Sequence, residues 1–116
     1  MEFRMSEPLY KVLSADLWQQ AEAEGEFRGA GIDLQDGFIH LSAPDQVKET
    51  VAKHFAGQGE LVLVTVDGDR LGDSLKWEAS RGGALFPHVY GVISMEAVQC
   101  VEPLPLNADS VHEFPF

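Results

Sequence analysis

Basic residues are scarce in this chain. Its 116 residues include 8 lysines and arginines against 19 aspartates and glutamates, which gives a formal net charge of −11 at pH 7. The basic residues are also scattered singly, whereas a nucleic-acid-binding surface clusters them to neutralise phosphates. We therefore predict that the chain binds neither nucleic acid nor an anionic membrane. A small anionic ligand is compatible with this charge, because backbone amides and a single arginine can hold a phosphate.

Cysteines and long hydrophobic runs are also nearly absent. The single cysteine, Cys100, excludes an intramolecular disulfide framework and a Cys-rich metal site. Its place in the apolar run 97–104 predicts a small buried side chain. The first ten residues hold no apolar segment of signal-peptide length, and no run reaches the roughly 20 residues of a membrane span. The sequence predicts a soluble cytoplasmic protein, and it leaves the oligomeric state open.

The length predicts one domain, residues 1–116, that ends in a surface tail over 107–116. Two helices are expected early, one over 15–24 after a Ser14 cap and one over 42–57 with Ser42 as its cap. Loops are expected over 25–37 and 81–88, where glycines gather. Strands are expected over 9–14, 38–42, 60–68, 75–80, 89–94 and 98–106. This order predicts an α+β fold with small, mainly antiparallel sheets.

The standard catalytic motifs are missing. The sequence has no G-x-G-x-x-G, no phosphate-binding P-loop, no G-x-S-x-G and no H-E-x-x-H. Three short strand segments beside glycine-rich loops instead carry side chains capable of chemistry. They are His40, Ser42, Trp77, Glu78, His88 and Tyr90.

Each of these residues also has a structural explanation. His40 fits a half-buried histidine that is hydrogen-bonded to a neighbouring strand, and Glu78 fits a solvated strand face. His88 follows Pro87, which restrains the backbone and favours a structural turn. Two residues outside this set, Trp18 and His54, lie on apolar helix faces and are expected in the core or at its boundary. Trp77 is likewise expected to anchor the core, unless its ring stacks on a ligand.

Taken together, the residues allow two kinds of chemistry. His40, His88 and Glu78 form an acceptable facial ligand set for zinc or iron. The same groups could bind the ribose of a nucleotide and stabilise an oxocarbenium ion, as carboxylates do in glycoside chemistry. Residue types alone leave both readings open.

Four segments occur in the order "YKVL", "DGFIHLSAPDQV", "LKWE" and "FPHVYG". In these segments the chain resembles a bacterial domain-of-unknown-function family, from about residue 9 to residue 106. That family is grouped with the ADP-ribosyltransferase-like fold, in which two small sheets flank a cleft for NAD. The segment "IHLS" is also similar to the "VHLS" strand of RNA 2′-phosphotransferases, which share the fold and use NAD. Those enzymes need several arginines for the RNA phosphate, and this chain has four in all.

The resemblance implies NAD or a related nucleotide as the ligand, with cleavage at the nicotinamide–ribose bond as the reaction. His40 and Ser42 would then position the ribose, and Tyr90 or Trp77 would stack on a ring. Glu78 would stabilise positive charge or activate the acceptor, with His88 beside it. No resident metal is predicted on this reading. The alternatives are a nucleotide-binding module without turnover and a metal-dependent enzyme that uses the two histidines and Glu78.

Overall fold

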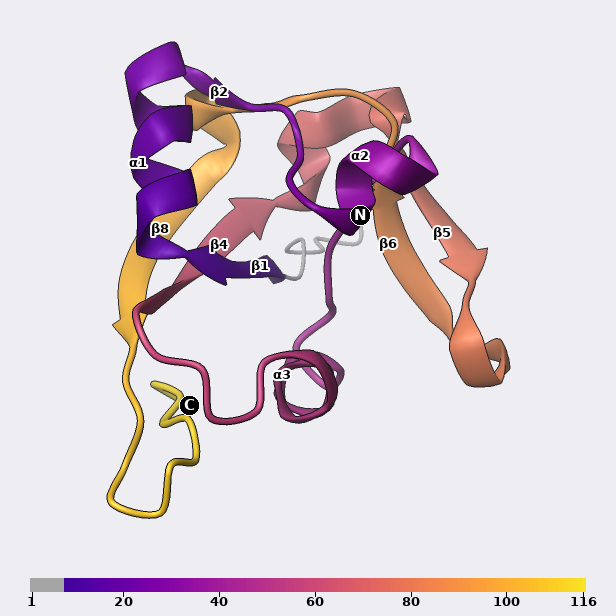
Figure 1. Cartoon of the computed structure of the whole chain (residues 1–116). Coiled ribbons are helices and arrows are strands. Elements are labelled where there is room, and N and C mark those ends of the chain that lie inside the picture. The colour runs from indigo at the N-terminus through magenta and orange to yellow at the C-terminus, as the bar shows by residue number, and fades with distance from the viewer. Residues whose placement is uncertain (1–7) are drawn as a thin grey trace, which may run out of the picture.

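Three small antiparallel sheets and three short α-helices make up the part of the chain that the computed structural model describes, residues 8–116 (Figure 1). The helices are α1 (Ala15–Glu24), α2 (Ile32–Asp36) and α3 (Val47–His54). The strands are β1 (Pro8–Ser14), β2 (Glu26–Phe27), β3 (Ile39–His40), β4 (Leu61–Asp67), β5 (Leu75–Ala79), β6 (Leu85–Val89), β7 (Ile93–Ser94) and β8 (Val98–Leu104). The predicted α+β class with small antiparallel sheets is confirmed. Residues 1–7, where the sequence predicts no signal peptide, lie outside the described residues.

Strand β4 is the centre of the largest sheet and is buried on both faces. The sheet has the order β1–β4–β8, and all of its pairings are antiparallel. The neighbouring residues Leu63 and Val64 point to opposite faces, and neither exposes any surface. Leu63 packs in a cluster with Val47 and Val51 of α3, whereas Val64 packs in a second cluster with Trp18 of α1. The near-continuous apolar run of β4 therefore separates two cores.

Helix α1 begins and ends where its sequence predicts. The Ser14 hydroxyl accepts a hydrogen bond from the Leu17 amide at 3.2 Å, which satisfies one of the free amides of the first turn. Gly25 ends the helix with a left-handed backbone, at φ 84°. Between these ends Trp18 is buried, as predicted, and its ring nitrogen donates to Glu22.

A second three-stranded sheet, in the order β3–β6–β5, extends from the other side of the molecule (Figure 1). Ile39 pairs with Val89, and His40 pairs with His88. Because side chains alternate across a strand, the first pair faces the core and the second faces away from it. Ile39 and Val89 are almost fully buried in the α1-side cluster. The sheet thus anchors on one face and presents its histidines on the other.

Several predicted elements are corrected. The segment 25–37 is not a continuous loop, because Glu26 and Phe27 pair with β7 and residues 32–36 form α2. The strand expected over 38–42 is regular only at Ile39–His40, and Ser42 adds an isolated bridge to Tyr10. The predicted Ser42 cap is wrong: α3 starts at Val47, and the Ser42 hydroxyl donates to Thr50 instead.

The chain from 81 to 94 also differs from the prediction. Strand β6 already begins at Leu85, so His88 lies inside a strand rather than in a stiff turn. This strand ends at Val89, and the short β7 follows after a bend. Pro87 is tolerated in this central strand because its backbone faces the β3 side, where the regular pairing stops at His40–His88 and the Pro87 carbonyl still accepts from the Leu41 amide.

Some burial predictions fail as well. Cys100 is exposed, since β8 is an edge strand with one face toward solvent. Trp77 is 45% exposed on the edge strand β5, and His54 is exposed at the end of α3. The tail is tied down more than expected, because His112 is buried and its Nε2 hydrogen-bonds the Gln58 carbonyl at 2.7 Å. No helix within residues 8–116 is long and apolar enough to cross a membrane.

The two-sided burial of β4 gives a direct test. Leu63→Ala is expected to lower the free energy of unfolding by about 2–5 kcal/mol, because it removes apolar atoms and leaves a cavity. Val101→Ala on the neighbouring edge strand, where the side chain is 37% exposed, is the matched control and should change stability by less than about 1 kcal/mol. Urea unfolding followed by circular dichroism measures both. Equal effects would show that β8 is covered in solution.

Candidate functional site

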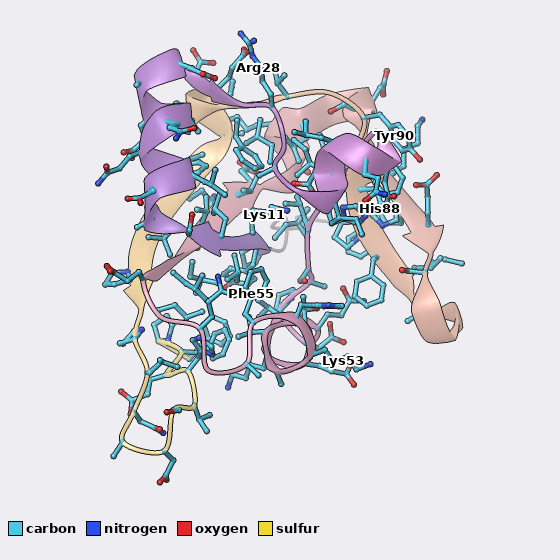
Figure 2. The ribbon with its side chains drawn as sticks, in the orientation of Figure 1. Lys11, Arg28, Lys53, Phe55, His88 and Tyr90 are labelled. Carbon is cyan, nitrogen blue, oxygen red and sulfur yellow. The ribbon has the colours of Figure 1, made fainter. Side chains whose placement is uncertain are left out.

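Five side chains gather on the outer face of the β3–β6–β5 sheet: Phe38, His40, Glu78, His88 and Tyr90. We call this surface the imidazole face. The two histidine rings lie edge to face, with centroids 5.3 Å apart. Glu78 contacts His88 from β5, where it lies on the same side of the strand as Lys76. Figure 2 shows His88 and Tyr90 beside α2, which lies next to this end of the sheet.

Glu78 is held in place by two donors. His88 Nδ1 and the Tyr90 hydroxyl both donate to Glu78 Oε1, each at 2.8 Å. These hydrogen bonds, from His88 first, hold the pKa of Glu78 below its usual range. The same contact raises the pKa of Tyr90. The Glu78 side chain nevertheless stays 39% exposed, whereas that of His88 is 6% exposed. The arrangement is a fixed, charged carboxylate that a ligand can reach.

Phe38 supplies the flat apolar part of the imidazole face. Its ring stacks on His88 with centroids 4.3 Å apart, and it lies 4.7 Å from His40 and 5.1 Å from Tyr90. Phe38 is half-buried and Tyr90 is 46% exposed, so both rings keep an edge or face toward solvent. Such a surface favours planar ligands, because aromatic rings gain by offset stacking and by burial together.

His40 is fixed by the buried carboxylate of Asp33. Asp33 Oδ1 accepts from His40 Nδ1 at 2.7 Å and from the His40 amide at 3.0 Å. Asp33 Oδ2 accepts from the Ala30 amide and lies 2.8 Å from the Lys11 ammonium. Lys11 comes from β1 and also donates to the His40 carbonyl, and Figure 2 shows it between β1 and α2. The network joins the large sheet, α2 and the imidazole face.

Burial and pairing act in opposite directions on this network. Burial alone would raise the pKa of Asp33, but the Lys11 charge and the hydrogen bonds from Lys11 and His40 outweigh it, so the pKa lies below its usual range. For Lys11 burial wins: it lowers the pKa although Asp33 opposes the shift. The lowered pKa of Asp33 keeps its carboxylate charged at neutral pH. The side chains are 1% and 12% exposed, so the pair is screened little by salt.

The structure brings four of the six sequence-predicted residues together. His40, Glu78, His88 and Tyr90 share the imidazole face. Ser42 is buried under α3 on Thr50, and Trp77 points from the other face of β5, opposite Glu78.

Three residues that matter here were not predicted. Phe38 lies two residues before His40, so strand geometry places both on the same face, and this spacing could have identified Phe38 as a site residue. Lys11 is a lysine inside an apolar strand, which signals a buried partner. No sequence feature identified Asp33 as a site residue, because the segment around it was predicted to be a loop.

The predicted metal ligands His40, His88 and Glu78 all have hydrogen-bond partners in the fold. His88 Nδ1 is bound to Glu78, and His40 has both ring nitrogens on carboxylates, Asp33 and Asp36. Within residues 8–116, no group of three or more His, Cys, Asp or Glu side chains is arranged to hold a metal ion.

The imidazole face and the strands that carry it fall within a segment that matches a known family. Residues 12–101 match the family described as "Protein of unknown function (DUF952)". The chain belongs to this family. It is similar to protein CC0527 from Caulobacter crescentus, with 51% sequence identity. The crystal structure of that protein superposes with a TM-score of 0.87 and covers 91% of this chain and 93% of that one.

The solution NMR structure of CC0527 agrees, at 52% identity and a TM-score of 0.81 over 90% of each chain. A search of curated proteins finds no match. The resemblance to a domain-of-unknown-function family is thus confirmed, and nothing in these comparisons tests NAD binding or ADP-ribosyl transfer.

The buried pair predicts a pH-dependent stability in this DUF952 chain. Asp33→Asn leaves the Lys11 ammonium buried without an anion and is expected to cost about 3–5 kcal/mol at pH 7. Because the pKa of Asp33 in the fold lies below its ordinary value of 3.8, the stabilisation that Asp33 provides is complete above that pH and is lost as the pH falls through the lower pKa. The difference between wild type and variant should therefore shrink below about pH 4.

Chemical unfolding from pH 3 to pH 7 measures this difference. Asp109→Asn, at an exposed position in the tail, makes the same change of charge and should alter little. The double variant Lys11→Met/Asp33→Asn should be more stable than Asp33→Asn alone. A stable single Asp33→Asn variant would contradict the network.

Proposed function

We propose that the protein binds NAD or a related nucleotide on the imidazole face and cleaves the nicotinamide–ribose bond. The observation that carries the proposal is the state of Glu78: charged, held by two hydrogen bonds and still 39% exposed beside two aromatic rings. A ring of the ligand stacks on Phe38 and Tyr90. The ribose lies over Glu78, with His40 at its edge.

The lowered pKa of Glu78 decides which role suits it. A carboxylate that loses its proton easily is a weak base at neutral pH, so proton abstraction from an acceptor is not its best use. A fixed negative charge is well suited to stabilising positive charge that develops on the ribose in the transition state. His88, buried behind Glu78, is a positioning residue that keeps the carboxylate in place.

The reaction balances without a further reactant. The bond from ribose C1′ to the nicotinamide nitrogen breaks, and its electron pair neutralises the pyridinium, so nicotinamide leaves uncharged. Water or another nucleophile forms the new bond to C1′, and its proton passes to solvent. The products are nicotinamide and an ADP-ribosyl group on the acceptor.

The first test separates binding from turnover. Calorimetry with NAD and ADP-ribose is expected to show binding, and incubation with NAD should release nicotinamide, measured by chromatography. Glu78→Gln should lower the release rate by about 100-fold, while NAD affinity changes only a few-fold, since charge stabilisation acts in the transition state. Glu113→Gln, an exposed tail residue, is the control and should behave as wild type.

The outcomes divide the alternatives. Binding without nicotinamide release would identify a non-catalytic nucleotide-binding module. No binding at millimolar NAD or ADP-ribose would contradict the proposal altogether. Activity that disappears on chelation and returns with zinc or iron would favour the metal-dependent alternative.

A further inference from the structure

The second carboxylate on His40 comes from Asp36. His40 Nε2 lies 3.0 Å from Asp36 Oδ2, while its Nδ1 lies 2.7 Å from Asp33 Oδ1. A carboxylate can accept a hydrogen bond and cannot donate one. With both carboxyls charged, the two contacts are both hydrogen bonds only when each ring nitrogen donates, so the geometry accommodates the imidazolium form of His40.

The two carboxylates differ in how firmly they are held. Asp33 is 1% exposed and receives hydrogen bonds from Ala30, Lys11 and His40. Asp36 is 40% exposed, and its contact with His40 is the one hydrogen bond of its side chain recorded within residues 8–116. Asp36 ends α2 directly before Gly37, whose φ of 85° is left-handed and open to few other residues. Asp36 can thus leave His40 at low cost, and Asp33 cannot.

In the imidazolium form of His40, the charges around the ring leave one positive charge in excess once Asp36 is set aside. Asp33 is matched by Lys11 of β1 at 2.8 Å. On β5, Glu78 is offset by Lys76, whose charge lowers the pKa of Glu78. His88 of β6 keeps its Nδ1 proton on Glu78, and the Tyr90 hydroxyl is likewise a donor to Glu78. The remaining partner for the His40 cation is Asp36.

We infer that Asp36 is an internal substitute for an anionic group of the ligand, and that His40 Nε2 is the anion-binding subsite of the imidazole face. A phosphate or carboxylate oxygen displaces the Asp36 carboxylate and accepts the same hydrogen bond. The inference rests on the proposed function for the identity of the ligand, in which the anion is a phosphate of the nucleotide. The resident carboxylate competes with that phosphate and makes the subsite selective for ligands with a strong acceptor.

Inorganic phosphate is the probe, because its binding does not depend on nicotinamide chemistry. Asp36→Asn keeps the shape of the side chain and removes the competing charge. Its phosphate affinity is expected to rise about tenfold over wild type, which is what a modest charge interaction near a protein surface is worth. The affinity is read from the His40 ring signals in an NMR titration. Asp109→Asn makes the same change in net charge and should leave the affinity unchanged.

A measurement on the unchanged protein guards against a variant that folds poorly. In ¹⁵N spectra recorded without phosphate at the pH of the phosphate titration, both ring nitrogens of His40 should show the signature of protonated nitrogen, as donation to Asp33 and Asp36 requires. An unprotonated Nε2 on His40, an equal phosphate affinity in Asp36→Asn, or an equal gain in Asp109→Asn would each overturn the inference.

The two proposals fail separately. If Asp36→Asn gains phosphate affinity but the protein does not bind NAD, the proposed function is contradicted and the inference of an anion subsite still holds. NAD binding and nicotinamide release without that gain contradict the anion subsite alone.

Discussion

The buried ion pair between Lys11 and Asp33 lies where the large sheet, α2 and the imidazole face meet, and the geometry of the site depends on it. Lys11 leaves the large sheet on the face that packs against α1, and Asp33 comes from α2. Asp33 also fixes the amide and ring of His40, the first residue of the imidazole face. Removing two charges from water is unfavourable, and several hydrogen bonds to the Asp33 carboxylate offset this desolvation. What the pair adds is a defined position for α2 and His40, more than net stability.

This anchoring explains the graded exposure of the imidazole face. The sheet beneath it is set by Ile39 and Val89, which are almost fully buried, so His88 on the next register position is held rigidly behind Glu78. Exposure then increases from His88 to Glu78 and Tyr90. The side chain that orients Glu78 is thus buried, and the side chains that a ligand would contact are exposed to solvent. A site needs both, because a charged side chain without support loses the geometry that makes its charge useful.

Sequence reasoning succeeded where local rules decide the structure and failed where tertiary contacts decide it. The β4 run and the Ser14 and Gly25 ends of α1 follow local rules, and the structure has them where those rules place them. Helix α2 is five residues long and is held by the tertiary contacts of Asp33, which no local pattern shows. Ser42 fits a cap by sequence, yet its strand bridge to Tyr10 carries the chain past that point before α3 begins. At the site, strand alternation brought His40 and Phe38 to one face, whereas Lys11 and Asp33 met only through the fold.

The strongly acidic composition and a nucleotide ligand are compatible once distance is considered. A net charge of −11 repels a long polyanion, which would touch much of the surface. A ligand with one or two phosphates senses mainly the charges within about 8–10 Å, because salt screens the rest. Lys11 is paired with Asp33, and the Lys76 charge acts on Glu78, so in our proposal His40 is the side chain that recognises the anion. The acidic composition that argues against nucleic acid is therefore compatible with the small nucleotide we propose, and in that proposal Asp36 makes the anion subsite selective.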